Sequence, residues 1–167
     1  MIKFVNYFFQ SLIIYLFFII GKIIGLKLSR EFYGFIFLNI APFFKSKKII
    51  RDNLRNLSKK IDERKAKIII SNMWKNYGMT FIEYIFLKDF RNSSTHIKIE
   101  GQNNIDQIKK RGKPVIFVSG HFSNYELMSM EITKKEIKLA TIYRPLNNYF
   151  LNPFMEYLRR KYVCQNQ

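Results

Sequence analysis

A histidine and a glutamate stand five positions apart beside a short apolar run, and together they could activate a hydroxyl group. His121 follows Gly120, and Glu126 comes five residues after the histidine. If the carboxylate held one imidazole nitrogen, the other nitrogen could take the proton of an attacking hydroxyl. Side chains five apart point roughly 140° away from each other on a regular helix. We therefore place His121 on a turn and Glu126 in the first turn of a helix, where the two can meet.

This spacing is a short motif that also arises by chance. With two histidines and 12 acidic residues in 167, a histidine with an acid at this offset is expected in roughly 14% of such sequences. The other histidine, His96, has Gly101 at the same offset. The alternative role for His121 is that of a loop histidine hydrogen-bonded to the backbone.

The elements around His121 are expected to form an α/β unit. The run 115–118 is β-branched and aromatic, and it ends at a glycine, which is typical of a buried strand followed by a turn. Strands are predicted at 96–100, 114–119 and 138–143, alternating with helices at 102–110, 123–133 and 149–161. Such alternation predicts a mostly parallel sheet with crossover helices. His121 would then follow the end of a strand, where α/β proteins usually place reactive groups.

The first part of the chain is expected to be helical and to meet a membrane. Residues 4–21 form a run without any charged side chain. The length of this run is the minimum for a transmembrane helix. An amphipathic helix lying in the membrane interface is the alternative. Lys3 precedes this run, whereas several basic residues follow it, so the rest of the chain is predicted to lie on the cytoplasmic side of the membrane. Three regions result: a membrane anchor at 1–28, a helical interfacial or cover region at 29–91, and an α/β catalytic core at 92–167.

The net charge of +17 indicates an acidic partner. Nucleic acid, anionic lipid headgroups and an acidic carrier protein all qualify. No zinc-finger spacing and no sustained heptad is found, so a nucleic-acid partner is not expected, and the apolar N-terminal run fits a membrane better. The single cysteine, Cys164, excludes an internal disulfide. Without a glycine-rich phosphate loop or metal-ligand spacing, we expect no cofactor and no metal.

Several stretches in one order point to a known family. Ahead of the predicted sheet these are Asn53-Leu54, Asn56-Leu57, Ile61 to Arg64, Met73 to Gly78, and Glu83. Within it they are Ile99 to Gly101, Gly112-Lys113, Ser119 to Phe122, Asn124 to Leu127, and Tyr143 to Leu146. Together they cover nearly the whole chain, which thereby resembles the bacterial lipid A biosynthesis late acyltransferases, the lauroyl and myristoyl transferases.

The resemblance implies a membrane-associated transferase of lipopolysaccharide biosynthesis. The donor would be an acyl carrier protein thioester, and the acceptor a phosphorylated glucosamine disaccharide lipid, the lipid A precursor. No serine or cysteine nucleophile elbow is visible, so the acceptor hydroxyl would attack directly. His121 would be the general base, and Glu126 would orient it.

Three further side chains are expected to serve this site. The developing oxyanion needs a donor, and a cation on the last predicted helix is a candidate. The resemblance favours Arg159, with Arg160 as the alternative. Arg144 could bind a phosphate of donor or acceptor, or form a surface ion pair. Asn124, within the motif around His121, is expected to contact the substrate.

Members of this family continue past the point at which this chain stops, Gln167, so the sheet is expected to be incomplete, and the chain is either a fragment or a shortened protein. Two other functions stay open: acylation of another glycolipid or of a glycerolipid, and a non-catalytic membrane protein that binds anionic lipid or nucleic acid. Electrostatic binding would fall steeply with salt and would not depend on His121.

Overall fold

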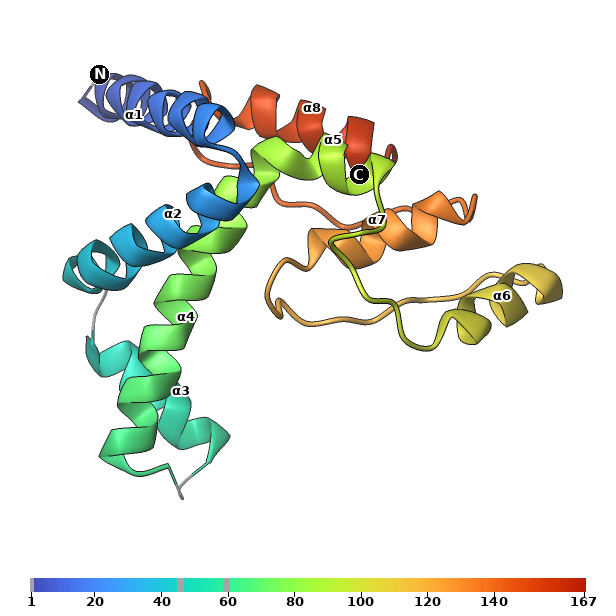
Figure 1. Cartoon of the computed structure of the whole chain (residues 1–167), viewed down its shortest axis with the longest axis horizontal. Coiled ribbons are helices and arrows are strands. Elements are labelled where there is room, and N and C mark those ends of the chain that lie inside the picture. The colour runs from blue at the N-terminus through green and yellow to red at the C-terminus, as the bar shows by residue number, and fades with distance from the viewer. Residues whose placement is uncertain (1, 45–46, 59–60) are drawn as a thin grey trace. The chain divides into compact units, whose positions relative to one another are not determined.

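The computed structural model describes residues 2–44, 47–58 and 61–167, and the chain is 69% helical (Figure 1). The helices in these ranges are α1 (Ile2–Ile24), α2 (Leu26–Ile40), α3 (Lys47–Leu57), α4 (Glu63–Glu83), α5 (Leu87–Asn92), α6 (Gln102–Arg111), α7 (Glu126–Lys134) and α8 (Asn152–Tyr162), with short 3-10 helices η1 (Ala41–Phe43) and η2 (Tyr84–Phe86). The chain forms two compact units. One contains residues up to Phe18 together with Tyr84–Gln167, and the other is Ile19–Glu83.

The predicted parallel sheet with crossover helices is wrong, because the described residues contain no strand. One isolated parallel bridge joins Ala140 to Asn166. The segments predicted as strands at 96–100, 114–119 and 138–143 are irregular. The last two border one cavity instead of pairing with each other. A strand makes its hydrogen bonds to a neighbour about 4.8 Å away, so two chains separated by a cavity cannot form a ladder. Ile116 and Val118 are accordingly about nine-tenths exposed, at 89% and 91%.

The three helices expected after residue 95 are confirmed, with small shifts at their ends. They correspond to α6, α7 and α8. The glycines at both ends of α6, Gly101 and Gly112, adopt the left-handed conformation that suits glycine. Pro153 lies in the first turn of α8, where a missing N–H costs nothing.

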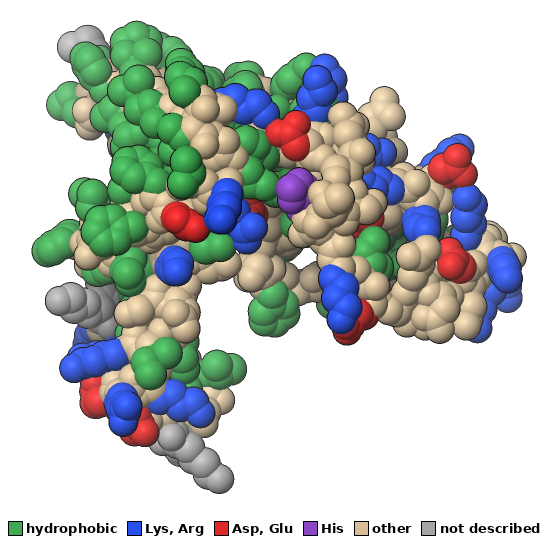
Figure 2. Space-filling model, viewed as in Figure 1, with side chains coloured by type: hydrophobic (Ala, Val, Ile, Leu, Met, Phe, Trp, Pro, Cys, Tyr) green, Lys and Arg blue, Asp and Glu red, His purple; other side chains and the backbone are tan. Residues whose placement is uncertain are grey.

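The helix α1 is long and apolar enough to cross a membrane, and no other helix among the described residues is. Its best window has a mean hydropathy of 1.9. Figure 2 shows hydrophobic side chains gathered over this helix. Within the first unit, α1 packs against the segment before α8: Tyr15 donates a hydrogen bond to the Phe150 carbonyl (2.7 Å), and the rings of Phe4 and Phe150 meet edge to face.

The second unit is built on the packing of α2 along α4 (Figure 1). Gly78 allows this close approach, because a Cβ at that position would overlap the Tyr33 carbonyl. The Tyr33 side chain is fully buried at the contact. Arg30 on α2 and Glu83 on α4 add an ion pair of 2.9 Å. Trp74 is buried here and packs against Tyr77, so it is a core residue.

Candidate functional site

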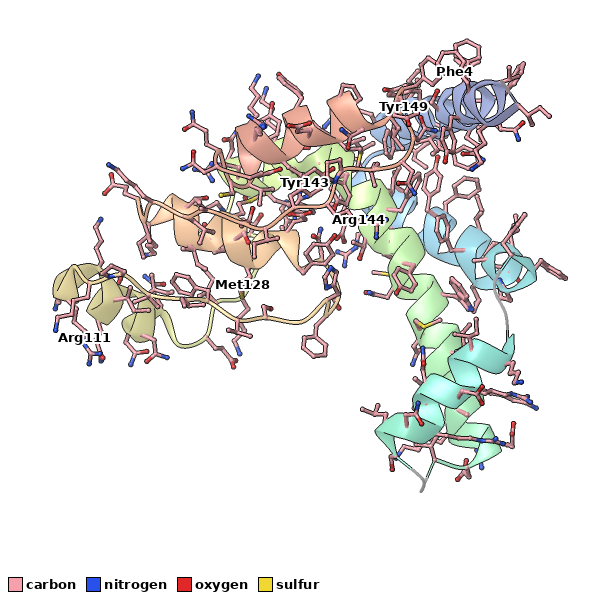
Figure 3. The ribbon with its side chains drawn as sticks, turned by 180° about the vertical axis from the view of Figure 1, so that it is seen from behind. Phe4, Arg111, Met128, Tyr143, Arg144 and Tyr149 are labelled. Carbon is pink, nitrogen blue, oxygen red and sulfur yellow. The ribbon has the colours of Figure 1, made fainter. Side chains whose placement is uncertain are left out.

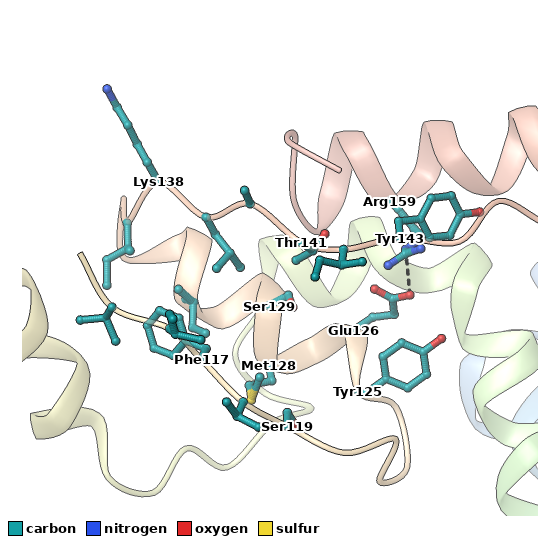
Figure 4. Close-up of a pocket in the computed structure, with 18 of the residues that line it drawn as sticks. Phe117, Ser119, Tyr125, Glu126, Met128, Ser129, Lys138, Thr141, Tyr143 and Arg159 are labelled. Carbon is teal, nitrogen blue, oxygen red and sulfur yellow. Dashed lines mark ion pairs between the residues drawn. The ribbon is translucent and has the colours of Figure 1, made fainter.

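A cavity of about 870 Å³ lies in the first unit. Its walls are the irregular segments 113–119 and 137–144, with parts of α7 and α8 (Figure 4). This volume falls in the range typical of small-molecule sites, roughly 300–1,000 Å³. His121, Glu126, Arg144 and Arg159 all line it, so one cavity brings together four of the five predicted site residues.

Glu126 is the first residue of α7, and its side chain is buried, with the residue 1% exposed. A carboxylate at this end of a helix faces the positive end of the helix dipole. Burial of a charge is costly unless it is paired, and here the partner is Arg159. The Arg159 Nε lies 2.9 Å from Glu126 Oε1 (Figure 4). The N–H does not point along this line, so the contact is an ion pair and not a hydrogen bond.

Arg159 lies in the last turn of α8, where a cation faces the negative end of the helix dipole. Its guanidinium also covers the ring of Tyr143, 4.0 Å from the ring centre. The Tyr143 hydroxyl in turn bonds the Asn152 side chain at 3.1 Å. The neighbouring arginine, Arg160, pairs with Glu156 on its own helix. Of the two arginines considered from the sequence, Arg159 is therefore the one that forms an ion pair with Glu126.

Tyr84, in η2, is a site residue that sequence reasoning missed. Its hydroxyl donates a hydrogen bond of 2.7 Å to Glu126 Oε1, the same oxygen that faces Arg159. Burial, and next the charge of Glu126, raise the pKa of Tyr84 well above its usual value, so the hydroxyl keeps its proton. Tyr84 lies 42 residues before Glu126, and no local pattern links them.

His121 is exposed on the turn before α7 and lines the same cavity. Its imidazole packs on the Tyr125 ring, with 4.2 Å between ring centres and 54° between planes. Ser123 turns the chain here through the left-handed region, with φ 48. The hydrogen bonds and ion pairs between described residues do not include one between His121 and Glu126. The predicted turn before the helix is thus present, whereas contact between the pair is not seen.

The two predicted substrate-binding residues lie in different surroundings. Arg144 is exposed in the segment before α8, next to Tyr143, and lines the cavity (Figure 3). None of the ion pairs between described residues involves it. Asn124 is half-buried between His121 and α7, and it is not among the residues that line the cavity.

The cavity is lined by both charged and apolar side chains. Glu126 is its single carboxylate among described residues, whereas Arg159, Arg144 and Lys113 are cations that line it. Lys138 also lines it, but its side chain extends outward (Figure 4). The apolar wall includes Ile108, Phe117, Met128, Ile132, Leu139 and Met155. The part of the chain that the structure describes holds no group of three His, Cys, Asp or Glu side chains that could bind a metal.

The cavity brings an exposed histidine and a buried acid–arginine pair together with further cations and apolar side chains, features that suit the binding of an anionic, partly apolar molecule. The family comparison agrees: residues 2–164 match the model of the bacterial lipid A biosynthesis acyltransferases. The chain belongs to this family and is an acyltransferase of lipid A biosynthesis. The family is membrane-associated, in keeping with the apolar helix α1. No curated protein and no solved structure matches the chain.

Proposed function

We propose that this protein moves a fatty acyl chain from an acyl carrier protein thioester to a hydroxyl of a phosphorylated lipid A precursor. The observation that carries the proposal is the cavity itself, in which His121 and the Glu126–Arg159 pair share one space with an apolar wall. The apolar wall suits a hydrocarbon chain, and the exposed cations suit phosphate groups. Membership of the family supplies the class of reaction.

His121 acts as the general base in this proposal. Its imidazole takes the proton of the acceptor hydroxyl as the oxygen attacks the thioester carbonyl carbon. The C–O bond forms, the carbonyl oxygen becomes an oxyanion, and the C–S bond then breaks. The leaving thiolate takes the proton back from the imidazolium, so the base is regenerated. His121 is exposed to the cavity, as a group that must reach a substrate hydroxyl has to be.

Arg159 is the cation available to the oxyanion in this proposal. Its guanidinium is fixed by Glu126 and by the Tyr143 ring, so it is already oriented before substrate binds. Glu126 orients His121 in the proposal, and catalytic contacts of this kind are often long without substrate and tighten with it. The Tyr125 ring, tilted against the imidazole, supplies the contact that holds His121 in the absence of substrate.

Arg144 is proposed to hold a phosphate of the acceptor or the donor. It is exposed at the cavity and has no carboxylate partner among the described residues. We therefore expect Arg144→Ala to raise the KM of the phosphorylated substrate roughly tenfold or more, with kcat little changed, because a charge-assisted hydrogen bond contributes about 1.5–3 kcal/mol.

In the assay, the protein is supplied with an acyl carrier protein thioester and a phosphorylated disaccharide lipid. Acylation of the lipid is then measured by mass spectrometry. Arg91→Ala is not a suitable control, because Arg91 bonds Thr133 and the Tyr162 carbonyl. Arg55→Ala in the second unit is a better one, since Arg55 is exposed on α3. If the parent protein adds no acyl chain to the acceptor lipid, the proposed function is contradicted. An unchanged KM in Arg144→Ala would contradict only the role of that arginine.

We also propose that α1 anchors the protein in the inner membrane, as residues 1–28 of the three-region organisation, with the following residues on the cytoplasmic side. Its exposed side chains are mostly apolar, for example Phe9, Ile13 and Ile23. We expect the protein to stay with the membrane fraction in high salt and to leave it in detergent, because apolar burial is insensitive to screening. Release by salt alone would favour attachment through the basic surface.

A further inference from the structure

We infer that Tyr84 is a positioning residue of the transfer reaction, which links Glu126 to His121 through Tyr125. This inference rests on the proposed function and extends it to a residue outside the histidine motif. Tyr84 lines the cavity, and its polar contacts go to Glu126 and Tyr125 and not to His121, so we expect it to act on the reaction through these two contacts.

The first contact fixes the carboxylate. Tyr84 donates to Glu126 Oε1 at 2.7 Å, and Arg159 approaches the same oxygen at 2.9 Å. A carboxylate held from two sides by a hydroxyl and a guanidinium cannot rotate freely. Because Glu126 is buried, the loss of a hydrogen bond would not be made good by bulk water.

The second contact reaches toward the histidine. The hydroxyls of Tyr84 and Tyr125 are 3.5 Å apart, and the Tyr125 ring packs against the His121 imidazole. A continuous set of contacts therefore runs from Glu126 through Tyr84 and Tyr125 to His121. These contacts connect the buried acid to the exposed base, although no hydrogen bond or ion pair joins the two directly among the described residues.

Tyr84 acts in this set as a donor and not as an acid or base. Its raised pKa keeps the hydroxyl protonated through the working range of pH. The tyrosine therefore presents one unchanging hydrogen-bond donor to the carboxylate. A phenylalanine would fill the same space without that donor, which separates the effect of the hydroxyl from that of packing.

The test is a double-mutant cycle on kcat in the acyl-transfer assay, with Tyr84→Phe, Glu126→Gln and the double variant. We expect Tyr84→Phe to lower kcat roughly tenfold to hundredfold, the effect of one hydrogen bond to a charged group, and to leave the KM of the acyl donor within about twofold. If Tyr84 acts through Glu126, the double variant is no slower than Glu126→Gln alone.

The matched control is Tyr15→Phe, which also removes a 2.7 Å tyrosine hydrogen bond, here to the Phe150 carbonyl. It should keep kcat within about twofold, and its effect should multiply with that of Glu126→Gln. If the parent is active and the Tyr84→Phe variant has the same kcat, this inference is contradicted and the proposed function is not. A double variant in which the losses multiply, or a Tyr84→Phe protein that unfolds at much lower temperature than Tyr15→Phe, shows a merely structural tyrosine and also overturns it. A parent without transferase activity contradicts the proposed function, and this inference with it.

Discussion

Replacing His121 by alanine is expected to lower the turnover of acyl transfer by roughly 10²–10⁴-fold, because that is the contribution of a general base. His121 is exposed to the cavity and makes its described contact through the Tyr125 ring, so its removal leaves the buried Glu126–Arg159 pair intact. The variant should therefore stay folded and stay in the membrane. Transfer to the lipid A precursor is measured with acyl carrier protein thioester, alongside membrane fractionation.

The other histidine provides the matched control. His96 packs against the Phe90 ring, with 5.6 Å between ring centres, and does not line the cavity. His96→Ala should keep its turnover within a few-fold of the parent. If His121→Ala also keeps its turnover within a few-fold of the parent, the general-base mechanism is wrong. Binding of an anionic partner by the basic surface would then be the better explanation of the protein's role.

The helices of this chain could be predicted from the sequence because the signals that define a helix are local. The uncharged run at 4–21 falls within α1, and the glycines at the ends of α6 mark where that helix begins and ends. The family could also be predicted, since its motifs stand in order along the chain. A helix makes its backbone hydrogen bonds within itself, so a short window of sequence contains most of what determines it.

The strands could not be predicted in this way because a strand depends on a partner elsewhere in the chain. Residues 115–118 are β-branched and aromatic, which shows that they would suit a pleated sheet, but not that another strand lies beside them. In the structure this segment and the one at 138–143 face each other across the cavity. Ala140 forms an isolated bridge with Asn166, near the end of the described chain. No local sequence pattern indicates this contact.

The candidate site was predictable where its residues lie in one motif, and was not where they come from distant parts of the chain. The spacing of His121 and Glu126 indicates a site, and both residues line the cavity. The contacts of Glu126 with Tyr84 and Arg159 span 42 and 33 positions, as the residue numbers show. Family resemblance indicated the arginine, whereas nothing in the sequence distinguished Tyr84 from the nine other tyrosines.

Replacing Arg159 by methionine is expected to lower the free energy of unfolding by about 3–5 kcal/mol, because it leaves a buried carboxylate without its counter-charge. The side chains of Arg159 and Glu126 are 10% and 2% exposed, so water cannot replace the lost partner. Methionine keeps much of the volume of arginine, which limits the effect of a cavity. Unfolding is followed by heat or denaturant in detergent.

Two further variants separate the buried charge from other causes. Arg160→Met breaks the neighbouring pair with Glu156, whose side chains are 53% and 32% exposed, so its effect should be about 0.5 kcal/mol or less. In the double variant Arg159→Met with Glu126→Gln, the unpaired charge is gone, and most of the lost stability should return. If Arg159→Met cost no more than Arg160→Met, Glu126 would not be held as a buried anion. Tyr84 would then donate to a carboxyl group that does not depend on the arginine, and the proposed orientation of the oxyanion donor would lose its basis.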